Sequence, residues 1–418
     1  MLAMDISAII GNFFHYGISF VVIISIIVFI HEYGHFSVAR FFGVKVDEFS
    51  IGFGKELHGW TDSKGTRWKI SLLPLGGFVK MHGDEDASSK ADAAKLKKMT
   101  KAEKDISFFF KPLWQKALIV AAGPAINFLL ALLIYSTIFA TYGKVEIEHS
   151  PTVGTVIEGG IAAKLGIQVD DKIVSIGGEK VQYFSDVQKK TMLSPSVETE
   201  ITVERKGELK QFKFVPQSEY IKDETGEFVQ VRLGIKNKPD QIIKQDEIHY
   251  NVFESVGAAA EKIYADCVNM LQGLAQVVVG ERSAKDMGGP VKIVEYSGMF
   301  TQSLSDSVVC AFGGEVKVKV PEGAKPISCG EMAMNGFINA FMFMAMISTM
   351  LGLMNLLPVP MLDGGHLAFY GIEAIIRRPV HEAVQEWAFR AGFAFLIGLM
   401  LYVTYNDIYS LVQRFILS

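Results

Sequence analysis

The sequence is poor in the residues that mark disulfide-stapled secreted domains and nucleic-acid-binding proteins. It has 3 cysteines among 418 residues, which is too few for a disulfide scaffold. Its 41 Lys and Arg face 45 Asp and Glu, and the formal net charge of -4 offers nucleic acid no overall positive field. The first thirty residues contain neither Lys nor Arg to form the basic start of a signal peptide. We therefore expect no nucleic-acid partner, and we expect the first apolar segment to be retained.

Charge is also scarce, because 21% of the residues are charged whereas 50% are hydrophobic, and the hydrophobic residues gather in blocks. A helix needs about 20 apolar residues to cross a hydrocarbon core of about 30 Å. Four blocks have that length: roughly 17–38, 115–141, 333–357 and 388–413. The pattern predicts a polytopic α-helical membrane protein with four transmembrane helices in the lipid bilayer.

The basic residues are spread unevenly between these blocks. Residues 40–116 carry many Lys and Arg, whereas residues 1–17 carry none. The positive-inside rule then places 40–116 in the cytoplasm, 142–332 outside, Arg377 and Arg378 inside again, and both termini outside. For a Gram-negative bacterium, the membrane would be the inner one and the outside would be the periplasm.

Two connecting segments have β-like patterns. Phe49–Phe53 and Trp68–Met81 mix β-branched, aromatic and glycine residues, which predicts short strands. They are apolar enough for a membrane-associated β-hairpin that reaches toward the active site, although a small cytoplasmic hairpin is the alternative. Residues 84–106 predict a charged, solvated connector. Outside, the segment from Ser150 predicts one compact β-rich module, with a hairpin over 201–215 that turns at Lys206-Gly207.

The segment from His31 to His35 has the form H-E-x-x-H. On a helix, His31 and His35 share one face and can bind one Zn²⁺, with Glu32 as the expected general base. The motif continues directly from Ile18–Ile30, which carry no charge, and ionisable residues at such depth need a function or partners. The alternative is that the span ends at Ile30 and the motif is ordinary interfacial polarity.

A catalytic zinc site uses three protein ligands and keeps one position open, so a third ligand must come from elsewhere. The stretch from Asn355 to His366 offers Asp363 and His366, between prolines that end the third span and glycines that permit a tight turn. Chemistry alone favours the two almost equally. His366 could otherwise cap the next helix.

Several separate motifs resemble those of the site-2 protease family of intramembrane zinc metalloproteases, in particular its bacterial branch of the regulator of sigma-E protease type. They are His31–His35, the segment Leu72–Lys80, Gly123-Pro124-Ala125-Ile126-Asn127, and Asn355–His366, and together they extend over nearly the whole chain. The resemblance implies that Leu362-Asp363-Gly364 supplies the third zinc ligand, Asp363. It also implies that the external module is a single PDZ domain, in which Asp170 stands where the family usually has glycine before Asp171.

We expect further residues to bind substrate. The hairpin segment with Gly76, Gly77 and Phe78 could pair with an extended substrate by strand addition. Asn355 is a candidate hydrogen-bonding partner for the substrate backbone, as its family position suggests, with a helix-packing amide as the alternative. Asn127 is interpreted as a packing residue at a helix kink.

The resemblance implies cleavage of single-span transmembrane proteins, such as anti-sigma factors or signal-peptide remnants, after an upstream site-1-type protease has trimmed them. The active site would lie in the cytoplasmic half of the membrane. Two alternatives remain open: a membrane-anchored protease of soluble substrates, and a PDZ-bearing membrane scaffold with a structural zinc. Only three zinc ligands are evident, with a base beside them, whereas a structural site would be closed by four.

The predicted organisation has seven segments. They are 1–45, the first span with the H-E-x-x-H motif; 46–114, the β-hairpin and connector; 115–142, the second span; 148–236, the PDZ domain; 237–331, external linker helices with an insertion at 310–329; 332–366, the third span and the aspartate motif; and 367–418, a cytoplasmic helix and the fourth span. Cys310 and Cys329 could pair across the base of the insertion in an oxidising compartment.

Overall fold

The computed structural model describes residues 6–84, 98–193, 197–216, 219–222, 228–231, 233–238, 240–279, 289–313 and 328–417. Most of the predicted connector over 84–106 and of the insertion over 310–329 lies outside these residues. The chain divides into two compact units. Unit 1 comprises Met1–Thr137, Ala259–Cys267 and Pro290–Tyr402, and unit 2 comprises Ile138–Ala258, Val268–Gly289 and Val403–Ser418.

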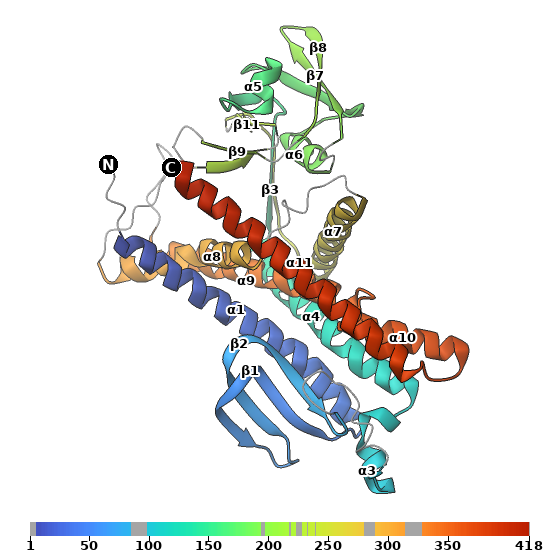
Figure 1. Ribbon diagram of the computed structural model, residues 1–418. Helices are drawn as coiled ribbons and strands as arrows, with labels where there is room; N and C mark the ends of the chain where they lie inside the picture. Colours follow the sequence, from blue (N-terminus) through green and yellow to red (C-terminus); the bar gives the residue numbers. More distant parts are fainter. Residues whose placement is uncertain are drawn as a thin grey trace. The chain divides into compact units, whose positions relative to one another are not determined.

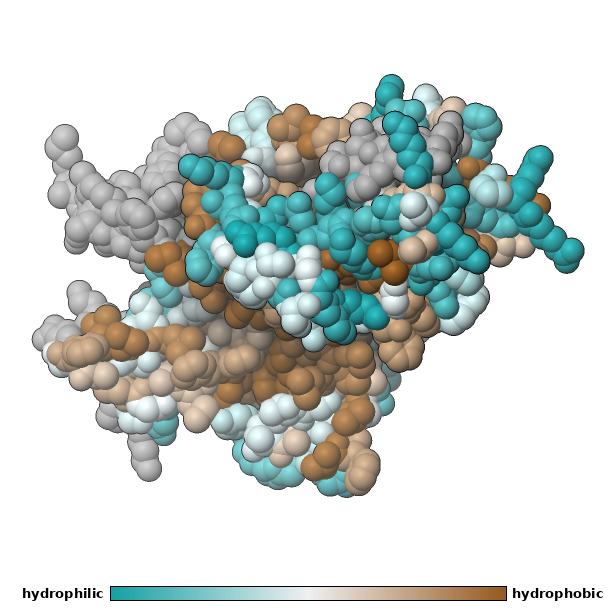
Figure 2. All heavy atoms as spheres, turned by 90° about the horizontal axis from the view of Figure 1, so that it is seen from below, coloured by the Kyte–Doolittle hydropathy of each residue, from teal (hydrophilic) through white to brown (hydrophobic). Residues whose placement is uncertain are grey.

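Within the described residues, four helices are long and apolar enough to cross a membrane, as predicted (Figure 1). They are α1 (Ile6–Phe41), α4 (Leu113–Tyr142), α9 (Cys329–Leu356) and α11 (Glu382–Leu417). The bounds of α4 and α9 agree with the predicted blocks to within a few residues, whereas α1 and α11 are clearly longer than theirs. Many of their large apolar side chains are exposed, as lipid-facing residues must be, among them Leu133, Phe395 and Leu401. Figure 2 shows such hydrophobic residues, in brown, over a broad part of the surface.

The helix ends follow from local sequence. At the end of α1, Gly43 adopts a left-handed φ of 69°, and the Val44 amide donates to the Ala39 carbonyl at 2.9 Å, which is the usual glycine cap. Helix α9 begins with a capping box between Ser328 and Glu331 and ends just before Pro358. Two further helices, α8 (Pro290–Ala311) and α10 (Asp363–Ile376), precede and follow α9. A disulfide joins Cys310 to Cys329 between α8 and α9, which confirms the predicted pairing.

The predicted β-hairpin is present as β1 (Val46–Thr61) and β2 (Arg67–Met81), and it packs against α1 (Figure 1). Residues 46–51 pair with 77–81, and residues 56–61 pair with 67–71, while residues 48–51 also face 67–70. Residues 77–81 therefore have a partner strand on one side only in the described sheet. Leu57, Leu72 and Leu73 are more than half exposed on this hairpin, which suits contact with lipid. The short helices α3 (Lys101–Ile106) and η1 (Phe108–Phe110) lead to α4.

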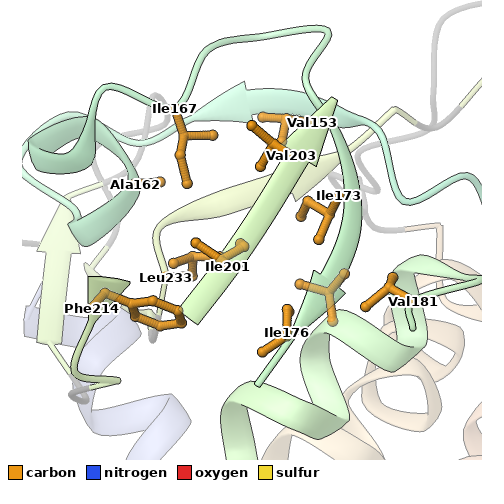
Figure 3. Packing of buried hydrophobic residues seen from close by; sticks show 11 residues of the cluster. Val153, Ala162, Ile167, Ile173, Ile176, Val181, Ile201, Val203, Phe214 and Leu233 are labelled. Carbon is orange, nitrogen blue, oxygen red and sulfur yellow. The ribbon is translucent and has the colours of Figure 1, made fainter. Parts of the chain in front are cut away.

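Unit 2 contains the β-rich module. Its main sheet has the order β6-β5-β7-β8, and β11 pairs with β4. The elements are β4 (Val153–Val156), α5 (Ile161–Leu165), β5 (Lys172–Ile176), β6 (Glu179–Lys180), α6 (Phe184–Leu193), β7 (Thr199–Arg205), β8 (Glu208–Phe214), β9 (Glu219–Lys222), β10 (Phe228–Val231) and β11 (Ile235–Asn237). Strands β7 and β8 confirm the predicted hairpin, with Lys206 and Gly207 both at positive φ in the turn. Figure 3 shows the module's core, in which Val153, Ile173 and Ile201 are fully buried.

Two features of unit 2 differ from the sequence analysis or refine it. Strand β3 (Lys144–His149) pairs with β12 (Ile242–Ile248), so the stretch predicted as linker helices begins with a strand before α7 (Val252–Val279). Asp170 adopts a φ of 73°, which is the left-handed conformation that glycine usually supplies, and its carboxylate pairs with Lys238. Aspartate tolerates this conformation better than most residues do, so the turn keeps its shape.

Candidate metal centre

His31 and His35 lie one turn apart on α1 and point the same way. Their Nε2 atoms are 3.3 Å apart, and their rings meet edge to face with centroids 4.9 Å apart. Both side chains are buried. The spacing of four residues on one helix therefore brings the two nitrogens together, as predicted.

Asp363 reaches the same point from a distant part of the chain. It is the first residue of α10, after the short break that follows α9, and its Oδ2 lies 3.3 Å from His31 Nε2 and 3.4 Å from His35 Nε2. This oxygen is buried and is otherwise without a hydrogen-bond partner among the described residues. The three side chains offer ligand atoms that all lie within 4.8 Å of one another.

The turn before α10 depends on glycine. A Cβ on Gly364 would lie 2.2 Å from the Leu357 carbonyl oxygen, and one on Gly365 would lie 2.4 Å from that of Val359. Met361 in the same turn has a φ of 86°. The chain can double back tightly enough to direct Asp363 at the histidines because these two positions carry no side chain.

His366, the alternative ligand, is not part of this group in the described residues. It lies one turn further along α10, and its ring packs 5.0 Å from the ring of Phe389 on α11. The structure therefore brings Asp363, and not His366, to the imidazole pair.

The three residues fit a zinc ion. The Nδ1 of His35 lies 2.9 Å from the Ile119 carbonyl oxygen, which can only accept, so the ring proton is on Nδ1 and Nε2 keeps its lone pair. Two imidazole nitrogens and a carboxylate oxygen with no other partner form the donor set of an open, three-ligand zinc site. Such a set can hold a metal ion and still leave a position for water or substrate.

Glu32 follows His31 on α1 and is half-buried. A Cβ on Gly77 would lie 3.1 Å from Glu32 Cγ and 3.1 Å from Val28 Cγ1, so strand β2 runs directly beside this glutamate. The hairpin thus lies next to the H-E-x-x-H motif, as the sequence led us to expect. A carboxylate in this position can take up and release a proton close to the three ligand atoms.

The other residues predicted to bind substrate lie at different distances from the three candidate zinc ligands. Asn355 on α9 places its Nδ2 3.3 Å from His31 Nε2. Gly76 has a φ of 131°, and a Cβ there would lie 2.4 Å from the ring of Phe53, while the ring of Phe78 stacks on Phe53 at 6.2 Å. Gly77 is therefore the hairpin residue beside the glutamate, whereas Gly76 and Phe78 shape the hairpin next to it.

Sequence analysis missed the part that α4 plays. Asn127, interpreted as a packing residue, is fully buried and lies 3.1 Å from His31 Nδ1. Gly123 lies against both imidazoles, because a Cβ there would be 2.3 Å from His35 Nε2 and 2.9 Å from His31 Cε1. The segment from Gly123 to Asn127 was visible as a motif, but nothing in the sequence says that it faces the histidines.

Comparison with known proteins supports the same chemistry. The profile of the family described as Peptidase family M50 matches residues 19–399. A protein of Agrobacterium fabrum that bears a zinc-metalloprotease name is 37% identical over 95% of this chain and 96% of its own length. A protein of Rhizobium meliloti with a similar name is 36% identical over 93% and 95%. Metalloprotease MmpA of Caulobacter vibrioides is 31% identical over 94% of each chain.

Proposed function

Because the chain belongs to peptidase family M50 and is a membrane zinc metalloprotease of the site-2 protease type, we propose that it cleaves transmembrane segments of single-span membrane proteins. The observation that carries this proposal is that His31, His35 and Asp363 come together from helices that span or adjoin the membrane. Glu32 follows His31, and strand β2 of the hairpin runs beside it. Hydrolysis at this depth suits a substrate that is itself in the membrane.

In this proposal His31, His35 and Asp363 hold the zinc ion. When bound, the zinc supplies a Lewis acid that activates water and polarises the scissile carbonyl. Glu32 takes the proton from the attacking water and gives it to the departing amine. The two imidazoles are held by α1 and the aspartate by the start of α10, so the three ligand groups keep their positions.

The hairpin would bind the substrate. A transmembrane helix hides its peptide groups in internal hydrogen bonds, so the cleaved segment must first be extended. Residues 77–81 lie at an edge of the described sheet, with Gly77 beside Glu32, and can pair with an extended segment. Gly76, Gly77 and Phe78 would line this edge, and Asn355, next to His31, would bond the substrate backbone on the other side.

We place the protein in the bacterial inner membrane, with the module at 148–236 as a periplasmic PDZ domain and the active site in the cytoplasmic half. The Lys- and Arg-rich segment 40–116 supports this orientation, and the module's strands, short helices and Asp170 turn support the domain assignment. The domain would bind a peptide terminus or exclude large substrates. Anti-sigma factors or signal-peptide remnants, already trimmed by a site-1-type protease, fit such a site.

Glu32→Gln tests the proposal with purified protein and a panel of tagged single-span substrates. We expect cleavage to fall by at least about a hundredfold, because the base is lost, while the zinc content stays unchanged. Glu386→Gln, at an exposed glutamate of α11, is the matched control and should cleave normally. Normal cleavage by Glu32→Gln would refute the role of the glutamate, and cleavage of soluble peptides alone would refute the substrate class.

A further inference from the structure

Helix α4 supplies a partner for the outward nitrogen of each imidazole. His35 Nδ1 donates to the Ile119 carbonyl at 2.9 Å, and His31 Nδ1 faces the side-chain amide of Asn127 at 3.1 Å. The hydrogen-bond partner of the nitrogen that faces away from a metal site decides which tautomer the histidine adopts. The two histidines therefore depend on α4 as well as on their own helix.

Asn127 is held in place by its neighbours. It is fully buried, and the Ser348 hydroxyl on α9 donates to its backbone carbonyl at 2.9 Å. Gly352 on α9 packs beside it, since a Cβ there would be in van der Waals contact with Asn127 Cβ at 3.4 Å. The side chain thus has little freedom except rotation of its amide, which exchanges the oxygen and the nitrogen in nearly the same positions.

The two amide orientations have opposite chemical consequences for His31. If Nδ2 points at His31, then Nδ1 must accept, the ring proton sits on Nε2, and Nε2 cannot bind a metal. If Oδ1 points at His31, then Nδ1–H donates and Nε2 is free to face Asp363. The structure shows the first orientation, in which Asn127 Oδ1 is buried and without a hydrogen-bond partner in the described residues.

We propose that Asn127 is a positioning residue of the zinc site, whose amide oxygen accepts the Nδ1–H of His31 and so keeps His31 Nε2 available to the metal. This proposal rests on the assignment of His31 as a ligand in the proposed function. It gives the two histidines matching partners, since a carbonyl oxygen holds one and an amide oxygen holds the other. Removing such a partner typically weakens metal binding about 10- to 100-fold.

The test measures zinc affinity of purified protein by competition with a chelator of known affinity. Asn127→Leu keeps the shape but cannot accept, and we expect it to bind zinc about 10- to 100-fold more weakly. Asn127→Asp keeps an acceptor oxygen and should bind within about threefold of the parent or more tightly. Thr349→Val, which removes a buried hydroxyl that donates to the Ala345 carbonyl of its own helix, is the control and should leave the zinc affinity unchanged. Melting of the metal-free proteins checks that each variant is folded.

The outcomes separate this inference from the proposed function. Parent-like affinity of Asn127→Leu, or equal weakening by Asn127→Leu and Asn127→Asp, would overturn the role of the amide oxygen. His31→Ala is measured in the same assay and should lose zinc. If His31→Ala binds zinc normally, the ligand assignment itself fails, whatever the asparagine variants do.

Discussion

Gly123 lies on α4 against both imidazoles, at a distance that leaves no room for a side chain. We expect Gly123→Ala to lower zinc content about tenfold or more, because its Cβ would lie 2.3 Å from His35 Nε2 and would displace a ligand atom. Metal analysis of the purified variant measures this effect. Gly257→Ala on α7, where a Cβ would meet nothing within 4 Å, is the matched control and should keep full zinc. Full zinc content in Gly123→Ala would show that the imidazoles can move aside.

In the β-rich module, Asp171 is almost fully buried and accepts from Arg205 at 2.7 and 2.6 Å and from the Gln168 amide at 2.8 Å. Burial alone would raise the pKa of this carboxyl, but the hydrogen bonds from Arg205 and Gln168 outweigh it and lower the pKa below its usual value. The charged form thus stabilises the fold above the unfolded pKa of about 4, and this stabilisation is lost as the pH falls through the folded pKa.

Asp171→Asn should therefore destabilise the module by about 2 kcal/mol at pH 7, since hydrogen bonds to a charged group are lost. Amide hydrogen exchange over 153–214 in the full chain measures the opening free energy, with Glu179→Asn as an exposed control. The difference in opening free energy between Asp171→Asn and the parent should become smaller as the pH falls below about 4. A difference that stays constant down to pH 2 would contradict the assigned titration.

At the residue scale, the sequence predicted the three side chains that the structure brings together, and it missed the residues of α4 that lie against them. His31, Glu32 and His35 are neighbours in one motif. The setting between prolines and glycines offered Asp363 and His366 almost equally, and the family resemblance pointed to Asp363. Asn127 lies 96 residues from His31 in the chain. A buried asparagine that packs and one that orients a histidine look the same in sequence, because only the packing of α4 on α1 distinguishes them.

Among the elements, those defined by their own composition were predictable. The four spans follow from apolar length, and the hairpin of β7 and β8 follows from strand patterns around Lys206-Gly207. The pairing of β3 with β12 was missed, because Lys144–His149 and Ile242–Ile248 are short and rich in charge. Each becomes a strand by pairing with a distant segment and not by its own pattern.

The disulfide between Cys310 and Cys329 ties the end of α8 to the start of α9 across 19 residues of sequence separation. By the chain-entropy account, closing a loop of this size stabilises the folded state by about 3 kcal/mol. We expect replacement of both cysteines by serine, or reduction, to lower the melting temperature of unit 1.

Thiol labelling measures the pairing, with Cys267 as the internal control because it is a free cysteine in the structure. We expect one label per folded chain in the parent before reduction, at Cys267, and three labels after it. Labelling of Cys310 and Cys329 without reductant would contradict the pairing, and an unchanged melting temperature in the double variant would contradict its contribution.

For the whole molecule, the family, the zinc chemistry and the four spanning helices agree, but the orientation in the membrane rests on charge alone. The orientation could be predicted from the sequence because the Lys and Arg beside each span direct its insertion into the membrane and need no tertiary contact to do so. The charge distribution therefore makes a prediction that is independent of the metal site.

Alkaline phosphatase, which is active only outside the cytoplasm, reports the orientation when fused after chosen residues. We expect low activity after residue 64, between β1 and β2, and after residue 379, which follows Arg377 and Arg378, because the positive-inside rule holds both segments in the cytoplasm. Fusions after residue 206, in the turn of the module, should be active. Replacing the lysines of residues 97–116 with glutamine should raise the activity after residue 64, because the retaining charge is then reduced. High activity after residue 64 in the parent would invert the orientation and place the hairpin on the outer side.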